Sequence, residues 1–257
     1  MSELPAALCA RNISRTYRDG DRLIQAVAPT SLELAEGRFI AIVGPIACGK
    51  STLLNMFCGL DRPDEGTIEA PGLGGEGLLG RVGYMPQNDL LMPWRDVAGN
   101  AAVGLECLGT ERALARSRAL AHMARFGLQG FEHAFPGQLS VGMRQRVAML
   151  RTFLCDRRIN MLDEPFGKLD AFTRASMQAW LLDYWQENRC TILFVTHDID
   201  EALLLSDEVH LMSPRPGRII LSLAVDIPRP RSYGEVVTSA PFNRLKARIL
   251  AQLGMAP

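Results

Sequence analysis

One stretch of the chain reads Gly44-Pro45-Ile46-Ala47-Cys48-Gly49-Lys50-Ser51-Thr52 and fits the pattern G-x-x-x-x-G-K-[ST] of a phosphate-binding loop. Such a loop points several backbone N–H groups into one concavity, and the helix that follows adds its positive N-terminal end. In this pattern Lys50 reaches the β- and γ-phosphates, and the Ser51 hydroxyl is a ligand of Mg²⁺. The stretch therefore predicts a nucleotide site in residues 44–52.

The flanks of this loop supply the strand and helix that the pattern requires. Residues 39–43, Phe-Ile-Ala-Ile-Val, are a short apolar run typical of a buried strand, and residues 52–58 predict a helix stopped by Gly59. These flanks disfavour the alternative of a glycine-rich turn without a ligand. Because Cys48 lies near the start of that helix, we expect a reactive thiolate there.

Composition narrows the class of protein. The chain has 257 residues, 47% of them hydrophobic, with 28 Lys plus Arg against 28 Asp plus Glu, so no net field attracts nucleic acid. The apolar runs are too short to span a bilayer, and the N-terminus has neither the basic nor the apolar segment of a secretory signal. Six scattered cysteines without a C-x-x-C are typical of a reducing compartment. We expect a soluble cytoplasmic protein.

Alternating strands and helices predict an α/β fold with a parallel sheet. Residues 8–17 and 23–34 alternate between apolar and polar and predict an antiparallel sheet, while 63–66 and the glycine-rich 71–80 predict a turn and a hairpin connection. Helical spacing predicts helices within 96–126, 140–154, 170–187 and 242–253. Further strands are expected at 81–85, 158–162, 191–195, 208–213 and 218–221. The helical residues from about 90 to 150 are an insert in this α/β pattern and would form a second lobe.

A pair of carboxylates follows the expected strand 158–162. At the end of a strand beside a phosphate loop, Asp163 would hold Mg²⁺ through water, and Glu164 would orient or deprotonate the attacking water. A charged strand end without catalytic function is the alternative, and the neighbouring loop disfavours it. Asn160 is a polar residue inside this strand and needs a hydrogen-bond partner.

A second anion site is expected at the start of the helix in 140–154. Ser140 is a plausible N-cap, and a hydroxyl, small residues and a helix N-terminus together can bind an anion. Because this site lies in the separate helical lobe, we expect it to complete the site of another subunit. By itself, the segment is better explained as an ordinary capped helix.

The order of these motifs resembles that of an ABC transporter ATPase subunit. The resemblance rests on the phosphate loop, Leu139-Ser140-Val141-Gly142-Met143, Leu162-Asp163-Glu164-Pro165 through Asp170, and Val195-Thr196-His197-Asp198, and it covers nearly the whole chain. Met85-Pro86-Gln87 followed by Leu90-Leu91-Met92-Pro93-Trp94 is similar to the nitrate, sulfonate and taurine importer branch. The Glu-Pro-Phe-Gly form at 164–167 is also similar to importers.

The resemblance implies a P-loop NTPase (RecA-like) core with an N-terminal antiparallel β subdomain and an inserted α-helical subdomain. It places the core in 1–89 and 155–225, the signature subdomain in 90–154, and a C-terminal extension in 226–257 of one domain, 1–257.

The resemblance also implies the roles of single residues. Tyr17 would stack on adenine, and the loop Gly44, Pro45, Ile46, Ala47, Cys48, Gly49, Lys50, Ser51 and Thr52 would bind ATP. Gln87 would contact both Mg²⁺ and the attacking water, and His197 would contact the γ-phosphate. The signature Ser140, Val141, Gly142 and Met143 would bind the γ-phosphate held by the partner subunit, with Asp170 at the interface. His122, His133 and His210 are interpreted as structural.

Some positions depart from the family pattern. Ile46 and Ala47 stand where Ser and Gly are frequent, and a positive φ at Ala47 would cost roughly 1 kcal/mol. Val141 replaces the first glycine of the signature, and Lys168 replaces a small residue near the interface. None of these changes removes a charge or a ligand that the chemistry needs.

These observations predict the ATP-hydrolysing subunit of an ABC importer, using ATP and Mg²⁺. Two copies would face each other head to tail, bind a separate polytopic membrane permease at the cytoplasmic face of the inner membrane, and serve an extracytoplasmic solute-binding protein. Leu91, Met92 and Trp94 are candidates for gripping the permease, with a place in the lobe core as the alternative. Two alternatives remain. One is a soluble ABC-type ATPase that acts on nucleic acid or protein, and the other is a P-loop kinase or transferase. The sequence does not identify the solute.

Overall fold

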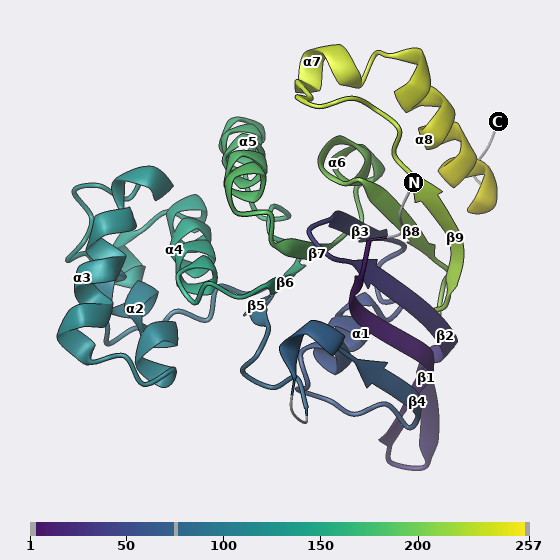
Figure 1. Cartoon of the computed structure of the whole chain (residues 1–257), viewed down its shortest axis with the longest axis horizontal. Coiled ribbons are helices and arrows are strands. Elements are labelled where there is room, and N and C mark those ends of the chain that lie inside the picture. The colour runs from purple at the N-terminus through teal and green to yellow at the C-terminus, as the bar shows by residue number, and fades with distance from the viewer. Residues whose placement is uncertain (1–3, 75–76, 255–257) are drawn as a thin grey trace.

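The computed structural model describes residues 4–74 and 77–254 and places their strands in two sheets (Figure 1). A three-stranded sheet has the order β2-β1-β4, and a six-stranded sheet has the order β5-β6-β7-β3-β8-β9. Residues 1–3, residues 75–76 of the connection 71–80, and residues 255–257 of the expected extension lie outside the described residues.

The central sheet is built around β3 (Phe39–Val43), whose residues are all buried, as the apolar run predicted. On one side lie β7 (Thr191–Thr196), β6 (Ile159–Asp163) and β5 (Gly83–Met85), all parallel to it. On the other lie β8 (Glu208–Met212), parallel, and β9 (Ile219–Ala224), antiparallel to β8. The parallel strands bring their carboxyl ends to one edge of the sheet, where the phosphate loop, Asp163 and His197 follow.

The N-terminal sheet pairs β1 (Ala6–Asp19) with β2 (Arg22–Ala35) in the expected antiparallel register, from Ala6 opposite Ala35 to Asp19 opposite Arg22. Its third strand, β4 (Glu65–Glu69), begins inside the stretch that we predicted as a turn. The turn prediction was wrong at this point because Gly66, with φ of +81°, lets the chain approach β1 so closely that a Cβ would lie 2.3 Å from the Arg11 carbonyl oxygen.

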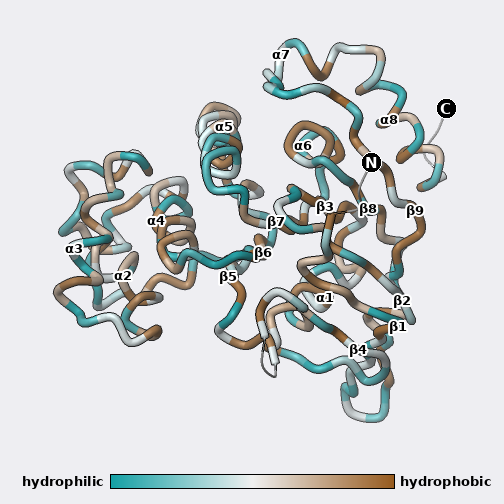
Figure 2. The backbone as a smooth tube through the Cα atoms, viewed as in Figure 1, coloured by the Kyte–Doolittle hydropathy of each residue, from teal (hydrophilic) through white to brown (hydrophobic). Residues whose placement is uncertain are grey.

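Helix α1 (Lys50–Phe57) packs between the two sheets. A separate lobe contains α2 (Val97–Cys107), α3 (Arg112–His122) and α4 (Val141–Phe153), with short 3₁₀ turns at Ala124–Phe126 and Pro136–Gln138, and lies to the left in Figure 1. The outer helix α3 has both hydrophilic and hydrophobic residues (Figure 2) and buries Ala115 and Ala119. The helical pattern expected across 96–126 is broken at Gly109, whose φ of +87° ends the first helix.

Helices α5 (Ala171–Asn188) and α6 (Ile199–Leu205) cover the other face of the central sheet. The C-terminal residues add α7 (Tyr233–Val236) and α8 (Ala240–Gln252). Sequence patterns predicted α5 and α8 but missed α6 and α7, because both are too short to repeat the apolar spacing of a helix over several turns. A 3₁₀ turn at Pro71–Leu73 precedes the gap in the described residues.

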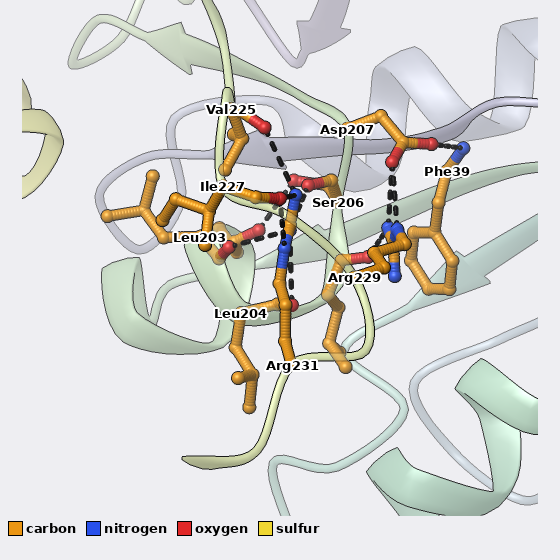
Figure 3. A network of polar contacts seen from close by, with 11 residues as sticks. Phe39, Leu203, Leu204, Ser206, Asp207, Val225, Ile227, Arg229 and Arg231 are labelled. Atoms are coloured by element: carbon orange, nitrogen blue, oxygen red, sulfur yellow. Dashed lines mark hydrogen bonds and ion pairs between the residues drawn. The ribbon is translucent and has the colours of Figure 1, made fainter. Parts of the chain in front are cut away.

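Two arginines fasten the C-terminal segment to the end of α6 (Figure 3). The buried guanidinium of Arg231 donates to the carbonyls of Leu203, Leu204, Ser206, Val225 and Ile227. Burial, with repulsion from Arg229, lowers the pKa of Arg231 to about 10, so it stays charged at neutral pH. Arg229 pairs with Asp207 at 2.9 Å and lies over the Trp185 ring, 4.4 Å from its centroid. Since α6 follows His197 directly, this network fixes the helix behind the candidate site.

Candidate nucleotide-binding and catalytic site

The phosphate loop closes around its own lysine between β3 and α1. Lys50 is only 5% exposed, and its ammonium donates to the carbonyl oxygens of Gly44 at 2.9 Å and Pro45 at 2.7 Å. Gly49 precedes α1 with φ of +109°, and a Cβ there would lie 2.5 Å from the carbonyl oxygen of Ala26. The loop therefore packs against β2, and the lysine charge sits at the head of a helix N-terminus, an arrangement suited to phosphate.

The departures at the tip of the loop are tolerated in this backbone. Ala47 adopts a φ of +60°, so this loop accepts a left-handed residue without glycine, at a cost of roughly 1 kcal/mol. Ile46 is 82% exposed and opposes no neighbour in the loop that its side chain would displace. The backbone geometry of a phosphate loop is thus kept by residues that the family pattern disfavours.

The expectation of a reactive thiolate at Cys48 was wrong. Its side chain turns inward and is 1% exposed. Burial raises the pKa of the Cys48 thiol, and the nearby charge of Lys50 only partly offsets this effect. A buried neutral thiol behaves as a small apolar side chain, so Cys48 contributes its backbone to the loop and its side chain to the core.

The carboxylates after β6 have different surroundings. Asp163 is 3% exposed beside the loop, and burial raises its pKa, against the opposing effects of a hydrogen bond from Ser51 and the charge of Lys50. Glu164 adopts a left-handed φ of +46°, a conformation that costs energy in a non-glycine residue. The two neighbouring carboxylates thus have different places: Asp163 is buried beside the loop, and Glu164 lines the cavity in front of it.

Two side chains from other strand ends converge on Glu164. Gln87, just after β5, donates from Nε2 to Oε2 of Glu164 at 3.0 Å. His197, just after β7, has Nδ1 3.4 Å from Oε1 of the same carboxylate. The strand order β5-β6-β7 brings these three side chains together, although they are separated by long stretches of sequence.

A cavity of about 390 Å³ opens in front of the loop and is of the size that small-molecule sites have. Its lining includes Lys50, Ser51, Thr52, Gln87 and Glu164, and Tyr17 stands at its far side. The Tyr17 hydroxyl donates to Oδ2 of Asp61 at 2.8 Å, and the Arg15 guanidinium lies over the ring, 4.9 Å from its centroid. A ring held in this way offers a stacking surface to a base.

The predicted signature lies elsewhere. Ser140 is exposed and caps α4 by accepting from the Met143 N–H at 3.2 Å, and Val141 is 42% exposed. None of residues 140–143 lines the cavity described above. Asp170 caps α5 by accepting from the Phe172 and Thr173 N–H groups. Within one chain these residues therefore form a second exposed surface, away from the first.

Comparison with known proteins decides the family. Residues 27–167, more than half of the chain, match the sequence profile described as ABC transporter. The chain belongs to the ABC transporter family. It is 43% identical over 210 residues to the taurine import ATP-binding protein TauB of Yersinia pestis, covering 82% of this chain and 82% of that protein. It is 38% identical over 240 residues to the aliphatic sulfonates import ATP-binding protein SsuB of Bacillus cereus, covering 93% of each.

Solved structures agree with this assignment. The fold matches the ATP-binding cassette MJ0796, solved as a dimer in a post-hydrolysis state bound to ADP and Pi, with a TM-score of 0.76 and 27% identity. The match covers 86% of this chain and all of that one. The predicted P-loop fold with its β subdomain and helical insert is confirmed, and the chain is an ABC ATPase that binds ATP. The kinase or transferase alternative is excluded by the family.

Several residues around this ABC ATPase site escaped sequence analysis. Arg15 and Asp61 hold Tyr17 although they lie 46 positions apart, and buried Gln145 of α4 donates to the Pro165 carbonyl behind Glu164. Asn88, next to Gln87, accepts a hydrogen bond at 2.6 Å from Lys168, which sequence analysis had noted only as a departure from the family pattern. Arg215, from the β8–β9 connection, lines the cavity. No local pattern marks these residues, because each acts across a tertiary contact.

Proposed function

We propose that the chain is the ATP-hydrolysing subunit of an importer for a small solute such as taurine, another sulfonate or nitrate. The convergence of Gln87 and His197 on Glu164 beside the phosphate loop carries the chemical part of this proposal. The relatives named above support the transport part, because both are described as import ATP-binding proteins.

The residues in the cavity fit Mg²⁺. This hard cation prefers oxygen ligands, and Ser51, Asp163 and Gln87 supply a hydroxyl, a carboxylate and an amide carbonyl near Lys50. The raised pKa of buried Asp163 is what a carboxylate shows when its counter-charge is incomplete. Bound there, the ion would neutralise charge on the terminal phosphates of ATP.

Each protein side chain has a distinct task in the proposed hydrolysis. The loop residues 44–52 bind the phosphates, and Tyr17 stacks on adenine. Glu164 accepts a proton from the attacking water, Gln87 orients that water through its hold on the carboxylate, and His197 binds the γ-phosphate. Gln87 and His197 each contact a different oxygen of the Glu164 carboxylate, so the water would approach this side chain from the cavity that it lines.

The position of the signature supports a head-to-tail dimer. Because Ser140 and Gly142 form a surface remote from the chain's own cavity, they can serve the ATP of a second copy, with Asp170 at the interface. A two-fold dimer satisfies both copies at once, and the matched cassette was solved as a dimer. In this arrangement 1–89 and 155–225 act as the nucleotide-binding core, 90–154 as the signature subdomain and 226–257 as a C-terminal extension of the single domain 1–257.

A membrane permease would be a separate polypeptide. No helix in the described ranges 4–74 and 77–254 is long and apolar enough to cross a bilayer. Of the residues expected to grip the permease, Trp94 is 74% exposed and lines a hollow with Phe135, whereas Leu91 packs against the lobe core. Trp94 is therefore the better candidate. The complex would sit at the cytoplasmic face of the membrane and receive solute from an extracytoplasmic binding protein.

Co-purification and reconstitution test this function. The chain should be captured by a polytopic membrane protein encoded beside it, and in proteoliposomes its ATPase should rise when the solute-loaded binding protein is added. ATPase that responds instead to DNA, with no capture by the permease, would support the alternative of a soluble ABC-type ATPase acting on nucleic acid or protein.

A further inference from the structure

We propose that Arg215 is a further nucleotide-binding residue, whose guanidinium binds phosphate oxygens of the ATP held by the same chain. Arg215 lies in the connection between β8 and β9, is exposed, and lines the cavity in front of the phosphate loop. The inference rests on the proposed placement of ATP in this cavity.

The connection that carries Arg215 is tightly built. The Ser213 N–H donates to the Arg218 carbonyl at 2.9 Å, and the Ser213 hydroxyl accepts from the Arg218 N–H at 3.1 Å. The same hydroxyl lies 3.0 Å from the Pro214 carbonyl oxygen and 3.2 Å from that of Pro216. Residues on both sides of Arg215 are therefore held, and less ordering is needed when the side chain meets a ligand.

Gly217 ties this connection to β2 by hydrogen bonds and packs it against the phosphate loop. Its N–H donates to the Ala26 carbonyl at 3.0 Å, and its carbonyl accepts from the Ala28 N–H at 2.9 Å. A Cβ at Gly217 would lie 2.0 Å from the Cys48 carbonyl oxygen, so only glycine allows this approach. Because Gly49 also packs against Ala26, the β8–β9 connection, β2 and the loop meet at one point. Arg215 thus has a fixed place relative to the bound phosphates.

The charges in the cavity favour a phosphate-binding role for Arg215, because little other positive charge is free to bind a triphosphate. Among the lining residues the other cation is Lys50, which is 5% exposed and already donates to two loop carbonyls, while Glu164 adds negative charge. In the described part of the chain Arg215 has neither an ion pair nor a side-chain hydrogen bond. A free guanidinium beside a strongly negative triphosphate would form charge-assisted, bidentate hydrogen bonds.

The test compares Arg215→Gln with Arg218→Gln, a matched control in the same connection. Arg218 is also exposed, but its side chain does not line the cavity. Dissociation constants are measured by calorimetry for MgATP and for inorganic tripolyphosphate, at low and at moderate salt. Arg215→Gln should weaken binding of both ligands by about tenfold or more, Arg215→Lys should recover part of the loss, and Arg218→Gln should stay within about twofold of the parent. Equal melting temperatures exclude a folding defect as the cause.

Three results would overturn the inference in distinguishable ways. If Lys50→Ala loses MgATP binding while Arg215→Gln binds as the parent does, the cavity holds the nucleotide and Arg215 does not touch it. If Arg215→Gln and Arg218→Gln lose the same amount of binding affinity, the effect comes from the overall positive charge of this surface. That result would also contradict a specific contact between Arg215 and the phosphates. If Lys50→Ala binds MgATP normally, the proposed nucleotide site itself is wrong, and the role of Arg215 falls with it.

Discussion

Gln87 donates to the carboxylate of Glu164 across 3.0 Å, and the chain that follows Gln87 leads directly into the helical lobe. This segment is tied to α4, the helix of the signature, because Arg144 pairs with Asp89 at 3.1 Å and Arg151 donates to the carbonyls of Asp89 and Leu90. A movement of the lobe would therefore reach Glu164, the proposed base, through one side-chain amide.

Replacement of Gln87 by Leu should slow hydrolysis much more than it weakens nucleotide binding, because the loop, Ser51 and Asp163 would still hold the phosphates and Mg²⁺. The change removes the donor that holds Glu164, so kcat should fall by about tenfold to a hundredfold, as expected when a hydrogen bond to a charged group is lost. Steady-state ATPase assays and MgATP titrations measure the two effects separately. Lys168→Met, which releases the neighbouring Asn88, is the control and should change kcat less. A Gln87→Leu protein with unchanged kcat would contradict the role given to this contact.

Tyr17 should recognise the base and not the phosphates. Tyr17→Ala should weaken ATP binding by about 1–3 kcal/mol, the range for loss of an aromatic stacking partner, and leave inorganic tripolyphosphate binding unchanged. Tyr17→Phe keeps the ring but loses the hydrogen bond to Asp61, so its effect should be smaller. Equal losses for ATP and tripolyphosphate in Tyr17→Ala would place Tyr17 outside the base site.

His210 should make the fold less stable in acid. It is buried, with Nδ1 2.8 Å from the Ser222 hydroxyl, and burial lowers its pKa from the ordinary 6.5 to about 4. Between these values the unfolded chain binds the proton and the folded chain does not. The stability present above pH 6.5 is thus lost as pH falls toward 4, by up to about 3 kcal/mol.

This effect is measured as a difference between two proteins. Burial raises the pKa of Glu208, whose carboxylate lies 3.3 Å from Nε2 of His210, and its protonation in the same range acts in the opposite direction. Urea unfolding of the parent and of His210→Gln at pH 7.5 and pH 4.5 isolates the histidine. The parent should lose more stability than the variant between these pH values, and parallel losses would contradict the prediction.

Arg231 should be important for stability. Arg231→Met removes a buried guanidinium that satisfies carbonyls at the end of α6 and in the segment after β9. Because those carbonyls would be left buried and unpaired, the free energy of unfolding should fall by about 3 kcal/mol or more. Arg244→Met, on the exposed side of α8, should change it by less than about 0.5 kcal/mol. Chemical denaturation of the three proteins checks the ranking.

Features that depend on neighbouring residues in the sequence could be predicted, whereas features that depend on contacts between distant residues could not. The phosphate loop and the Asp163–Glu164 pair are local patterns next to buried strands, so their elements and their place at the sheet edge were predicted correctly. The inward turn of Cys48 depends instead on packing against residues far along the chain, and a local rule for helix N-termini predicted the opposite.

The same reasoning covers the elements and contacts that were missed. Strand β4 exists because Gly66 approaches β1, and α6 is anchored by Arg231, a residue beyond the next two strands. Arg215 reaches the cavity because Gly217 fits against the loop backbone. No periodicity or characteristic spacing in the sequence marks these contacts. They follow from steric fit between segments, which appears only once the chain is folded.

The most decisive variant is Glu164→Gln, because it separates binding from chemistry. Lys50 and Ser51 line the cavity and Asp163 lies buried beside the loop, whereas Glu164 lines the cavity where the attacking water is proposed to bind. Glutamine keeps the shape and hydrogen-bonding reach of the side chain but removes its charge and basicity. MgATP binding should survive while turnover falls by about a hundredfold or more. Normal turnover in this variant would exclude Glu164 as the base.

The same variant tests the shared site. Ser140 of one copy and Lys50 of the other would hold one unhydrolysed ATP between them, so Glu164→Gln should run as a dimer on a sizing column with MgATP and as a monomer without it. Lys50→Ala should fail to dimerise because it cannot hold the nucleotide. Adding Ser140→Arg to Glu164→Gln should abolish the dimer, since Ser140 is exposed on the proposed interface and arginine places bulk and charge there. A Glu164→Gln protein that binds MgATP tightly yet stays monomeric would overturn the head-to-tail arrangement while leaving the nucleotide site in place.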